Sequence, residues 1–241
     1  MITLFGVTLS PYVWMVLGAI LGYCIGTIPT GLIVGKLFFK KDIRAEGSGN
    51  IGATNAIRAL GKLPGFLVLV IDMVKAFILP YYLFVHLPWG DSEVGFKSGM
   101  GLMEILGEMI KQIFSNIATI QYSAFIIGVS SFFILLGNCF NGFLKFKGGK
   151  GVATTYGVFF ALQPAATVFA AITYGFVFFL TKTSALGSLI SLFFLPIYIF
   201  LISLYSDTEI SNFLAGLAAV FYVIVFVKHW PNIKKLVSKQ N

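Results

Sequence analysis

Long apolar runs separated by short polar loops form the main pattern of this chain. Most runs reach the roughly 20 residues that an α-helix needs to cross a bilayer. They cover residues 11–39, 63–87, 122–140, 151–182, 185–205 and 211–227. The first run contains Pro29 and Gly31 near its end, which predict a kink. The pattern as a whole predicts an all-α integral membrane protein.

The run at 151–182 is too long for one typical span and carries Gln163 and Pro164 at its middle. A single helix here would place the lysines of the last loop on the opposite side of the membrane from Lys40 and from the lysines of 145–150. Two short helices that turn near Pro164 place all of them on one side, as the positive-inside rule requires. We therefore predict seven membrane helices, with the N-terminus outside and the C-terminus in the cytoplasm.

The segment 91–121 has a different pattern. Its apolar residues recur at helical spacing, and polar residues take the other side. The apolar set is Leu102, Leu106, Met109, Ile110, Ile113 and Ile117. We predict an amphipathic helix within 99–117 that lies on the membrane surface. A partner-facing or simply mobile loop is an equally good interpretation.

The composition agrees with a membrane protein. Hydrophobic residues make up 58% of the 241 residues and charged residues only 11%, which excludes an ordinary soluble domain. The first ten residues carry no basic segment and 15–39 contains no small-residue cleavage site, so the first run predicts a retained helix rather than a signal peptide. We expect residues 1–241 to form one domain.

The net charge of +8 comes from lysines and arginines in short loops beside the apolar runs. Nearly all of them fall in loops on the predicted inner face, whereas the outer loops hold only Lys97 and Lys111 among more numerous acidic residues. This is the pattern of membrane orientation. It argues against a nucleic-acid partner and places the basic loops in the cytoplasm.

Three polar stretches on that inner face have the composition of anion-binding loops. They are GSGNIGATNAIR at 47–58, KFKGGKGVAT at 145–154 and KHWPNIKK at 228–235. Glycines let the backbone approach a ligand closely, and backbone N–H groups beside a lysine can hold a phosphate. The alternatives are plain connectors and, for Lys145 and Lys147, contact with anionic lipid headgroups. The GGKG segment lacks the spacing of a Walker motif and implies no nucleotide.

Other polar residues lie within or beside the apolar runs. Asp72 and Lys75 share a helix face, where a structural ion pair and a site-lining role are equally good interpretations. The two cysteines, at 24 and 139, have no second ligand at metal-binding spacing, so we expect no metal site and no disulfide framework. His86 and Asp91 match the H-x-x-x-x-D spacing of another class of acyltransferases, but they lie on the predicted outer side.

Together, the three stretches resemble the bacterial acyl-phosphate-dependent glycerol-3-phosphate acyltransferases of the inner membrane, the PlsY family. The resemblance covers nearly the whole chain. It includes IPTG at 28–31, GSGNIGATNAIRALGK at 47–62, the pair Asp72 and Lys75, FKGGKGVAT at 146–154 and H-x-x-N-I-K at 229–234. It implies seven membrane helices in the bacterial cytoplasmic membrane. It also implies transfer of an acyl group from acyl phosphate to the 1-hydroxyl of glycerol 3-phosphate, giving lysophosphatidic acid.

The resemblance implies site residues by position. Those with catalytic roles are Ser48, Arg58, Lys150, His229 and Asn232. Those that bind substrate are Gly47, Gly49, Asn50, Thr54, Asn55, Gly148, Gly149, Gly151, Ser184 and Ser188. No cofactor is implied, and the partners are glycerol 3-phosphate, acyl phosphate and membrane lipids. The sequence leaves the oligomeric state open, with a monomer as one interpretation.

The chain departs from the family pattern at two places. Gly137, Asn138 and Asn141 stand where the family's second motif usually has Gly, His and Pro. Lys239 and Asn241 replace the Gly and Glu that usually close the third motif. The segment 91–121 is also longer than the usual connector.

A mechanism follows as a hypothesis. Acyl phosphate has a good leaving group, so the site mainly has to bring two phosphorylated substrates together and stabilise the developing charge. Arg58 and Lys150 would neutralise the phosphates, while Ser48 and Asn232 orient them. The proton of the attacking hydroxyl would go to His229 or to a substrate phosphate, whose second pKa is about 6.

Two further questions stay open at this stage. The acyl chain would come from the bilayer between helices, along Phe-rich segments such as Phe159, Phe160 and residues 176–179, although such residues are far more often plain lipid-facing surface. A transporter or binding protein for an organophosphate anion would also use basic glycine-rich loops. It would be expected to show an internal repeat and charged or broken helices near the membrane midplane. The sequence shows no convincing repeat, and its polar residues concentrate on one face.

Overall fold

The structure is a computed structural model, and it describes residues 1–4, 6–88, 122–206 and 209–238. Helices dominate it. They are α1 (Pro11–Thr27), α2 (Thr30–Phe39), α3 (Ala53–Leu60), α4 (Lys62–His86), a helix over residues 122–139, α6 (Val152–Leu162), α7 (Pro164–Thr181), α8 (Ser184–Ser206) and α9 (Glu209–Val237). Short 3-10 turns lie at Ile43–Ala45 and Gly142–Leu144. In the described ranges, six helices are long and apolar enough to cross a membrane.

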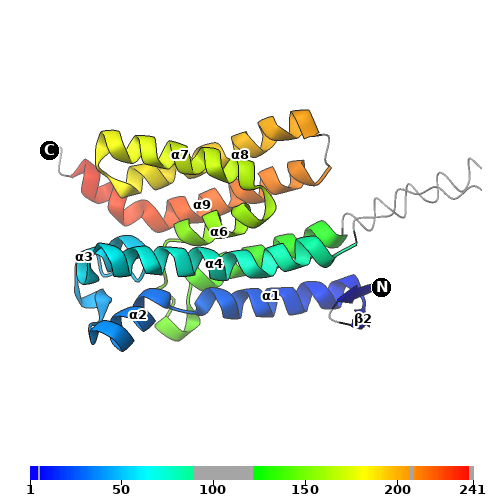
Figure 1. The fold of residues 1–241 in the computed structure, drawn as a ribbon, viewed down its shortest axis with the longest axis horizontal. Coiled ribbons are helices and arrows are strands. Elements are labelled where there is room, and N and C mark those ends of the chain that lie inside the picture. The colour runs from blue at the N-terminus through cyan, green and yellow to red at the C-terminus, as the bar shows by residue number, and fades with distance from the viewer. Residues whose placement is uncertain (5, 89–121, 207–208, 239–241) are drawn as a thin grey trace, which may run out of the picture.

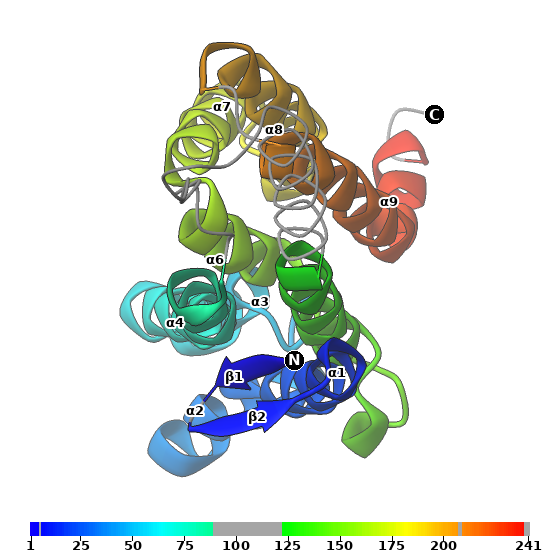
Figure 2. The same cartoon turned by 90° about the vertical axis from the view of Figure 1, so that its right-hand side faces the viewer.

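The helices run roughly along one axis, and the N- and C-termini lie at opposite ends (Figure 1). Viewed along that axis, α1, α2 and α4 form one side of the molecule and α7, α8 and α9 form the other, with α6 between them (Figure 2). The buried apolar side chains of α4, α6, α8 and α9 belong to one continuous core. A smaller core combines side chains of α2, the turn after it, α3 and α4 with Ile51, and so supports the loop at 47–52.

The prediction of an all-α protein missed a small β-hairpin at the N-terminus. Strands β1 (Ile2–Leu4) and β2 (Val7–Leu9) pair antiparallel, with Ile2 opposite Leu9. The alternation of buried and exposed residues in β1 and the positive φ of Gly6 are both typical of a hairpin. The Trp14 indole donates a hydrogen bond to the Ile2 carbonyl at 2.8 Å and so ties the hairpin to α1.

The predicted kink near Pro29 is a complete break between α1 and α2. α1 ends at Thr27, and α2 begins at Thr30 after Ile28 and Pro29. Proline lacks the N–H that would continue the helical ladder, so the chain turns there. Gly31 follows at once, and a Cβ at this position would clash with the backbone oxygen of Ile51. The break therefore lets the polar loop at 47–52 pack directly on α2.

The turn predicted near Pro164 is confirmed. α6 ends at Leu162 and α7 begins at Pro164. With 11 residues, α6 is only about 16 Å long, shorter than the roughly 30 Å hydrocarbon core of a bilayer. Most of its residues are buried, so α6 is enclosed by the other helices rather than by lipid. Of the seven predicted spans, this one is too short to cross alone.

The last helix extends further than predicted. The apolar run ends at 227, but α9 continues through Pro231 to Val237. Hydropathy marks where a helix leaves lipid, whereas the backbone hydrogen bonds continue into the polar stretch. His229 and Asn232 therefore stand one helical turn apart on the same face rather than in a loop.

Small residues bring α1 against the helix at 122–139. Gly18, Gly22 and Gly26 repeat every fourth residue along α1. A Cβ at Gly22 would clash with the backbone oxygen of Ser130, and one at Gly26 with that of Ile134. Such small-residue stripes let membrane helices approach until their backbones touch. This packing fixes the helix that leads directly into the second polar stretch.

Candidate active site

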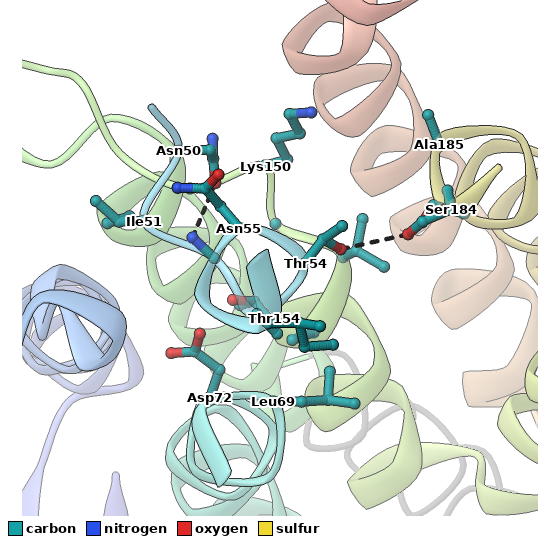
Figure 3. A pocket seen from close by; sticks show the side chains of 18 of the residues that line it. Asn50, Ile51, Thr54, Asn55, Leu69, Asp72, Lys150, Thr154, Ser184 and Ala185 are labelled. Carbon is teal, nitrogen blue, oxygen red and sulfur yellow. Dashed lines mark hydrogen bonds between the residues drawn. The ribbon is translucent and has the colours of Figure 1, made fainter. Parts of the chain in front are cut away.

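A cavity of ≈ 640 Å³ lies where the three polar stretches meet. Its lining comes from the loop at 47–52, α3, the loop at 149–151, the turn between α7 and α8, and the end of α9 (Figure 3). All five residues predicted to be catalytic line this one cavity: Ser48, Arg58, Lys150, His229 and Asn232. The fold thus gathers side chains that are up to 184 positions apart in the chain, since 232 − 48 = 184.

Asn55 shapes the first loop. Its side chain is buried, and its Oδ1 accepts hydrogen bonds from the Ser48 backbone N–H at 2.8 Å and from the Ser48 hydroxyl at 3.2 Å. Its Nδ2 donates to the Ile43 carbonyl at 2.7 Å. Gly47 has a φ of 59°, and a Cβ there would clash with Asn55 Oδ1. Asn55 lines the cavity, but both ends of its amide are engaged within the loop.

The start of α3, directly after the first loop, is connected to α8. Thr54 Oγ1 lies 3.3 Å from Ser184 Oγ, which in turn lies 3.1 Å from the Tyr174 hydroxyl (Figure 3). Asn50 Oδ1 accepts from the Gly52 N–H at 2.9 Å, which closes a local turn. All of these residues, together with Ser188, line the cavity. Of the two predicted glycines in this loop, Gly47 lines the cavity and Gly49 does not. Gly49 has a φ of 70°, which suits its place in the turn.

Asn138 holds the second loop in place. Its carbonyl accepts a hydrogen bond from the Gly149 N–H at 2.8 Å. A Cβ at Gly148 would clash with the same carbonyl oxygen, and one at Gly149 would lie 2.6 Å from Asn138 Oδ1. Only glycine fits this close to Asn138. Gly148 makes this close contact but does not line the cavity. The hydrogen bond and the contact with Gly148 come from the Asn138 backbone, which any residue at this position would supply, and only the contact with Gly149 involves the side chain.

The second departure, Asn141, joins the loop to the helix break. Its Nδ2 donates to the Thr27 carbonyl at 2.6 Å, and its own carbonyl accepts from the Phe146 N–H at 2.8 Å. Asn141 is buried. Lys239 and Asn241, the departures at the C-terminus, lie outside the described residues.

The second loop ends at the N-terminus of α6. Gly151 caps the helix with a φ of 82°, and Val152, Ala153 and Thr154 of the first turn line the cavity beside Lys150. The first N–H groups of a helix have no partner within it and carry partial positive charge, which favours an anion. The Thr154 hydroxyl is buried and makes no hydrogen bond. This end of the cavity has the chemistry of a phosphate site.

His229 has one ring nitrogen that could accept a proton. It is 3% exposed, and its Nδ1 lies 2.8 Å from the Val225 carbonyl one turn earlier in α9. A carbonyl only accepts hydrogen bonds, so Nδ1 carries the proton and Nε2 keeps a lone pair. Asn232 lies one turn further along the same face and also lines the cavity.

Asp72 and Lys75 form a buried ion pair at 2.7 Å, and both line the cavity. The pair closes the break between α1 and α2. Lys75 Nζ donates to the Ile28 carbonyl at 2.7 Å, and the Thr30 hydroxyl donates to Asp72 Oδ1 at 2.8 Å. Both interpretations of this pair therefore hold, since it anchors the backbone and borders the cavity.

The basic residues in and near the cavity differ in whether they form an ion pair. Arg44 lies outside it and forms an ion pair with Asp42 at 2.6 Å, and its hydrogen bonds hold the pKa of the Asp42 carboxyl at about 2. Arg58 lines the cavity and forms no ion pair with any residue in the described part of the chain. Lys182 lines it from the turn between α7 and α8.

Sequence reasoning left some lining residues out. Lys182, Thr154 and Tyr174 were not among the predicted site residues, although a lysine at the end of an apolar run beside Ser184 was a usable signal. The apolar part of the lining includes Leu69, Met73 and Ala171. Phe159 is instead buried in the core against Phe221, and residues 176 and 179 are 65% and 69% exposed on the helix surface.

The remaining predictions lie away from the cavity or outside the described residues. His86 stacks on Tyr82 at the far end of α4, and its supposed partner Asp91 is not described. The amphipathic helix predicted within 99–117 also falls in the undescribed segment. The described ranges contain no group of three or more His, Cys, Asp or Glu side chains that could hold a metal ion.

Comparison with known proteins gives concordant matches. The sequence profile of the family described as "Glycerol-3-phosphate acyltransferase" matches residues 16–239. A glycerol-3-phosphate acyltransferase of Staphylococcus haemolyticus is 35% identical over 220 residues, covering 90% of this chain and 91% of the relative. One from Pelagibacter ubique is 33% identical over 222 residues, covering 92% and 93%.

Solved structures agree in fold. The crystal structure of PlsY (YgiH), an integral membrane glycerol 3-phosphate acyltransferase, in its glycerol 3-phosphate form superposes with a TM-score of 0.71. The two chains are 26% identical, and the match covers 94% of each. The lysophosphatidic acid form of the same enzyme gives a TM-score of 0.69 at 25% identity, covering 94% and 93%.

Proposed function

Since this chain belongs to the glycerol-3-phosphate acyltransferase family, we propose that it transfers an acyl group from acyl phosphate to the 1-hydroxyl of sn-glycerol 3-phosphate. It is a membrane protein and a glycerol-3-phosphate acyltransferase of the PlsY type. The products of the proposed reaction are lysophosphatidic acid and phosphate. No cofactor takes part in it.

The observation that carries this proposal is the shared cavity. Five polar residues from three distant stretches line it, and they include two cations, Arg58 and Lys150. The N-terminus of α6 adds backbone N–H donors beside Lys150. Both proposed substrates carry a phosphate, so a cavity with two cations and a helix N-terminus suits them together.

In the proposed reaction, Arg58 and Lys150 neutralise the two phosphates and hold them close enough for reaction. The 1-hydroxyl oxygen attacks the acyl carbonyl carbon, the bond from that carbon to the phosphate oxygen breaks, and phosphate leaves with the bonding electrons. His229 Nε2 takes the hydroxyl proton, because Nδ1 is already held by the Val225 carbonyl. Ser48 and Asn232 orient the substrates.

The acyl chain occupies the apolar part of the cavity, against Leu69, Met73 and Ala171. Ala171 lies in the middle of the membrane-crossing helix α7, yet it is exposed and lines the cavity. A residue with both properties supports a sideways opening toward the bilayer. A membrane-dissolved donor would come in on this side, and water-soluble glycerol 3-phosphate would come in from the basic loops.

We further propose seven membrane-embedded helices in a single domain, with the N-terminus outside and the C-terminus in the cytoplasm of a bacterium. The distribution of lysines and arginines supports this orientation. So does the placement of the two termini at opposite ends of the bundle (Figure 1). In this arrangement α6 is the short seventh helix, and the cavity lies at the cytoplasmic face of the inner membrane.

The reaction is tested directly with the purified protein in detergent. Glycerol 3-phosphate is supplied with palmitoyl phosphate or, in parallel, with palmitoyl-CoA, and lysophosphatidate is measured. We expect product from the acyl phosphate only, and a loss of at least about 100-fold in kcat/KM for Lys150→Ala. Product from the CoA donor alone would refute the proposed donor. No product from either donor, with glycerol 3-phosphate still bound, would favour an anion-binding or transport protein.

A further inference from the structure

We propose that Lys182 binds the phosphate of the acyl donor, on a different wall of the cavity from Arg58 and Lys150. This inference rests on the proposed function and adds a third cation to it. Lys182 and Thr183 form the connection between α7 and α8, and both line the cavity. Neither belongs to the three polar stretches that the sequence singled out.

The position of Lys182 is set by its backbone. It caps the C-terminus of α7 in the left-handed conformation, with φ 53° and ψ 19°, and its N–H donates to the Phe178 carbonyl at 2.8 Å. Two residues later, Ser184 is within hydrogen-bonding distance of Thr54 and Tyr174. The turn that carries Lys182 is therefore tied to α3, the helix that carries Arg58.

The Lys182 ammonium remains available to an anion. Its Nζ lies 4.4 Å from the centre of the Phe179 ring, and the side chain is exposed. It forms no ion pair among the residues that the structure describes. An exposed cation–π contact is weak compared with a charge-assisted contact to a phosphate, so an approaching phosphate can displace the ring.

Charge balance calls for such a group. The two substrates together bring about three to four negative charges at pH 7, since each phosphate carries about −1.5 to −2. Arg58 and Lys150 supply two positive charges. Like charges held close together repel strongly when part of the surrounding water is excluded. A third cation at the margin of the cavity reduces this repulsion.

Geometry assigns Lys182 to the acyl donor rather than to glycerol 3-phosphate. The apolar lining of the cavity includes Ala171 on α7, and Tyr174 lines it one turn further along. Lys182 ends the same helix about 12 Å beyond Tyr174, at 1.5 Å for each of eight residues. A molecule whose acyl chain lies along this face of α7 has its head group at the end where Lys182 stands. Glycerol 3-phosphate has no chain to align with that face.

The test compares Lys182→Met with wild type at a fixed detergent concentration. Met keeps the length and Cβ of the side chain and removes the charge. We expect the KM for palmitoyl phosphate to rise about tenfold, as loss of one charge-assisted contact predicts. The KM for glycerol 3-phosphate should stay within about twofold and kcat within about threefold. Inhibition by inorganic phosphate should weaken by a similar factor of about ten, and Lys182→Arg should restore most of the affinity.

Lys40→Met is the matched control. Lys40 also caps the C-terminus of a helix in the left-handed conformation, with φ 52°, and it is exposed, but it does not line the cavity. We expect its kinetics to equal those of wild type. An unchanged KM for palmitoyl phosphate in Lys182→Met would overturn the inference, as would a rise in the KM for glycerol 3-phosphate alone. If wild type makes no lysophosphatidate in the same assay, the proposed function fails, and this inference fails with it.

Discussion

Asn55 is a buried side chain whose amide joins Ser48 to Ile43 through three hydrogen bonds. In Asn55→Ala these bonds are lost, and the Ile43 carbonyl keeps only the backbone N–H of Glu46, at 3.4 Å. We expect a loss of about 1–3 kcal/mol in the free energy of unfolding, as the loss of several buried hydrogen bonds predicts. We also expect kcat/KM to fall about 100-fold, because Ser48 loses its position. Thermal unfolding and steady-state kinetics measure the two effects.

Asn55→Asp serves as the comparison variant for Asn55→Ala. It keeps the oxygen that accepts from Ser48 but replaces the donor to Ile43 by a second oxygen. An intermediate kcat/KM would show that the contact with Ser48 supports catalysis separately from the contact that supports stability. Wild-type kinetics in Asn55→Ala would contradict the role of this side chain in shaping the loop.

The second prediction at the residue scale concerns the proton acceptor. In His229→Asn the ring nitrogen Nε2 is lost, while a polar side chain remains at the same position in α9. We expect kcat to fall by about 10²–10⁴, the usual contribution of a general base. The measurement is turnover at saturating concentrations of both substrates. Near-normal turnover would transfer the role of base to a substrate phosphate.

Sequence and structure agree unequally at the scale of single residues. Ser48, Arg58, Lys150, His229 and Asn232 could be predicted because they occur in short, specific motifs, and all five line one cavity. The internal use of Asn55 could not be predicted, since its partner Ile43 lies outside the motif. Lys182 was missed for a similar reason. The lysine at the end of an apolar run beside Ser184 was the only local signal, and its place at the cavity also depends on how the turn between α7 and α8 packs.

At the scale of elements, the close packing of α1 on the helix at 122–139 gives a stability prediction. A Cβ at Gly22 would clash with the Ser130 backbone oxygen, so Gly22→Ala must push two helices apart. We expect a loss of about 1–3 kcal/mol in the free energy of unfolding, equivalent to a fall of a few degrees in Tm. Thermal unfolding in detergent measures this change.

Gly175→Ala on α7 is the matched control, because a Cβ at that position meets nothing within 4 Å. There we expect no loss of stability and even a small gain, since Ala has the higher helix propensity. Equal Tm values for the two variants would show that the contact between α1 and the helix at 122–139 does not limit stability.

The elements themselves were predicted to different degrees. The break between α6 and α7 was predicted because it places the lysines of all the basic loops on one side of the membrane. That argument uses the whole chain rather than the run at 151–182 alone. The extension of α9 beyond 227 was missed because hydropathy reports the lipid boundary and not the end of a helix. The N-terminal hairpin was missed because two strands of three residues give only a weak periodic signal.

At the scale of the whole molecule, the proposed orientation can be measured by labelling. Thr8→Cys places a thiol in the exposed hairpin, and Phe143→Cys places one in the exposed turn at the other end of the bundle. A membrane-impermeant maleimide should label Thr8→Cys in cells with an intact inner membrane. Phe143→Cys should react only after that membrane is permeabilised. The reverse pattern would invert the orientation.

Wild type controls for the two native thiols in this labelling experiment. Cys139 is buried, and Cys24 lies within the membrane-crossing stretch Pro11–Phe39. A membrane-impermeant maleimide is polar and does not enter the hydrocarbon core, so it does not reach a thiol there. We therefore expect little background from either cysteine.

The cavity borders both basic loops and a membrane-exposed residue of α7, and this arrangement has a kinetic consequence. If the donor reaches the site only from within the bilayer, its effective concentration is its mole fraction in the lipid phase and not its amount per litre. Adding inert phospholipid to vesicles that hold a constant quantity of acyl phosphate should then slow turnover in proportion to the dilution. The dependence on glycerol 3-phosphate, which arrives through water, should stay the same.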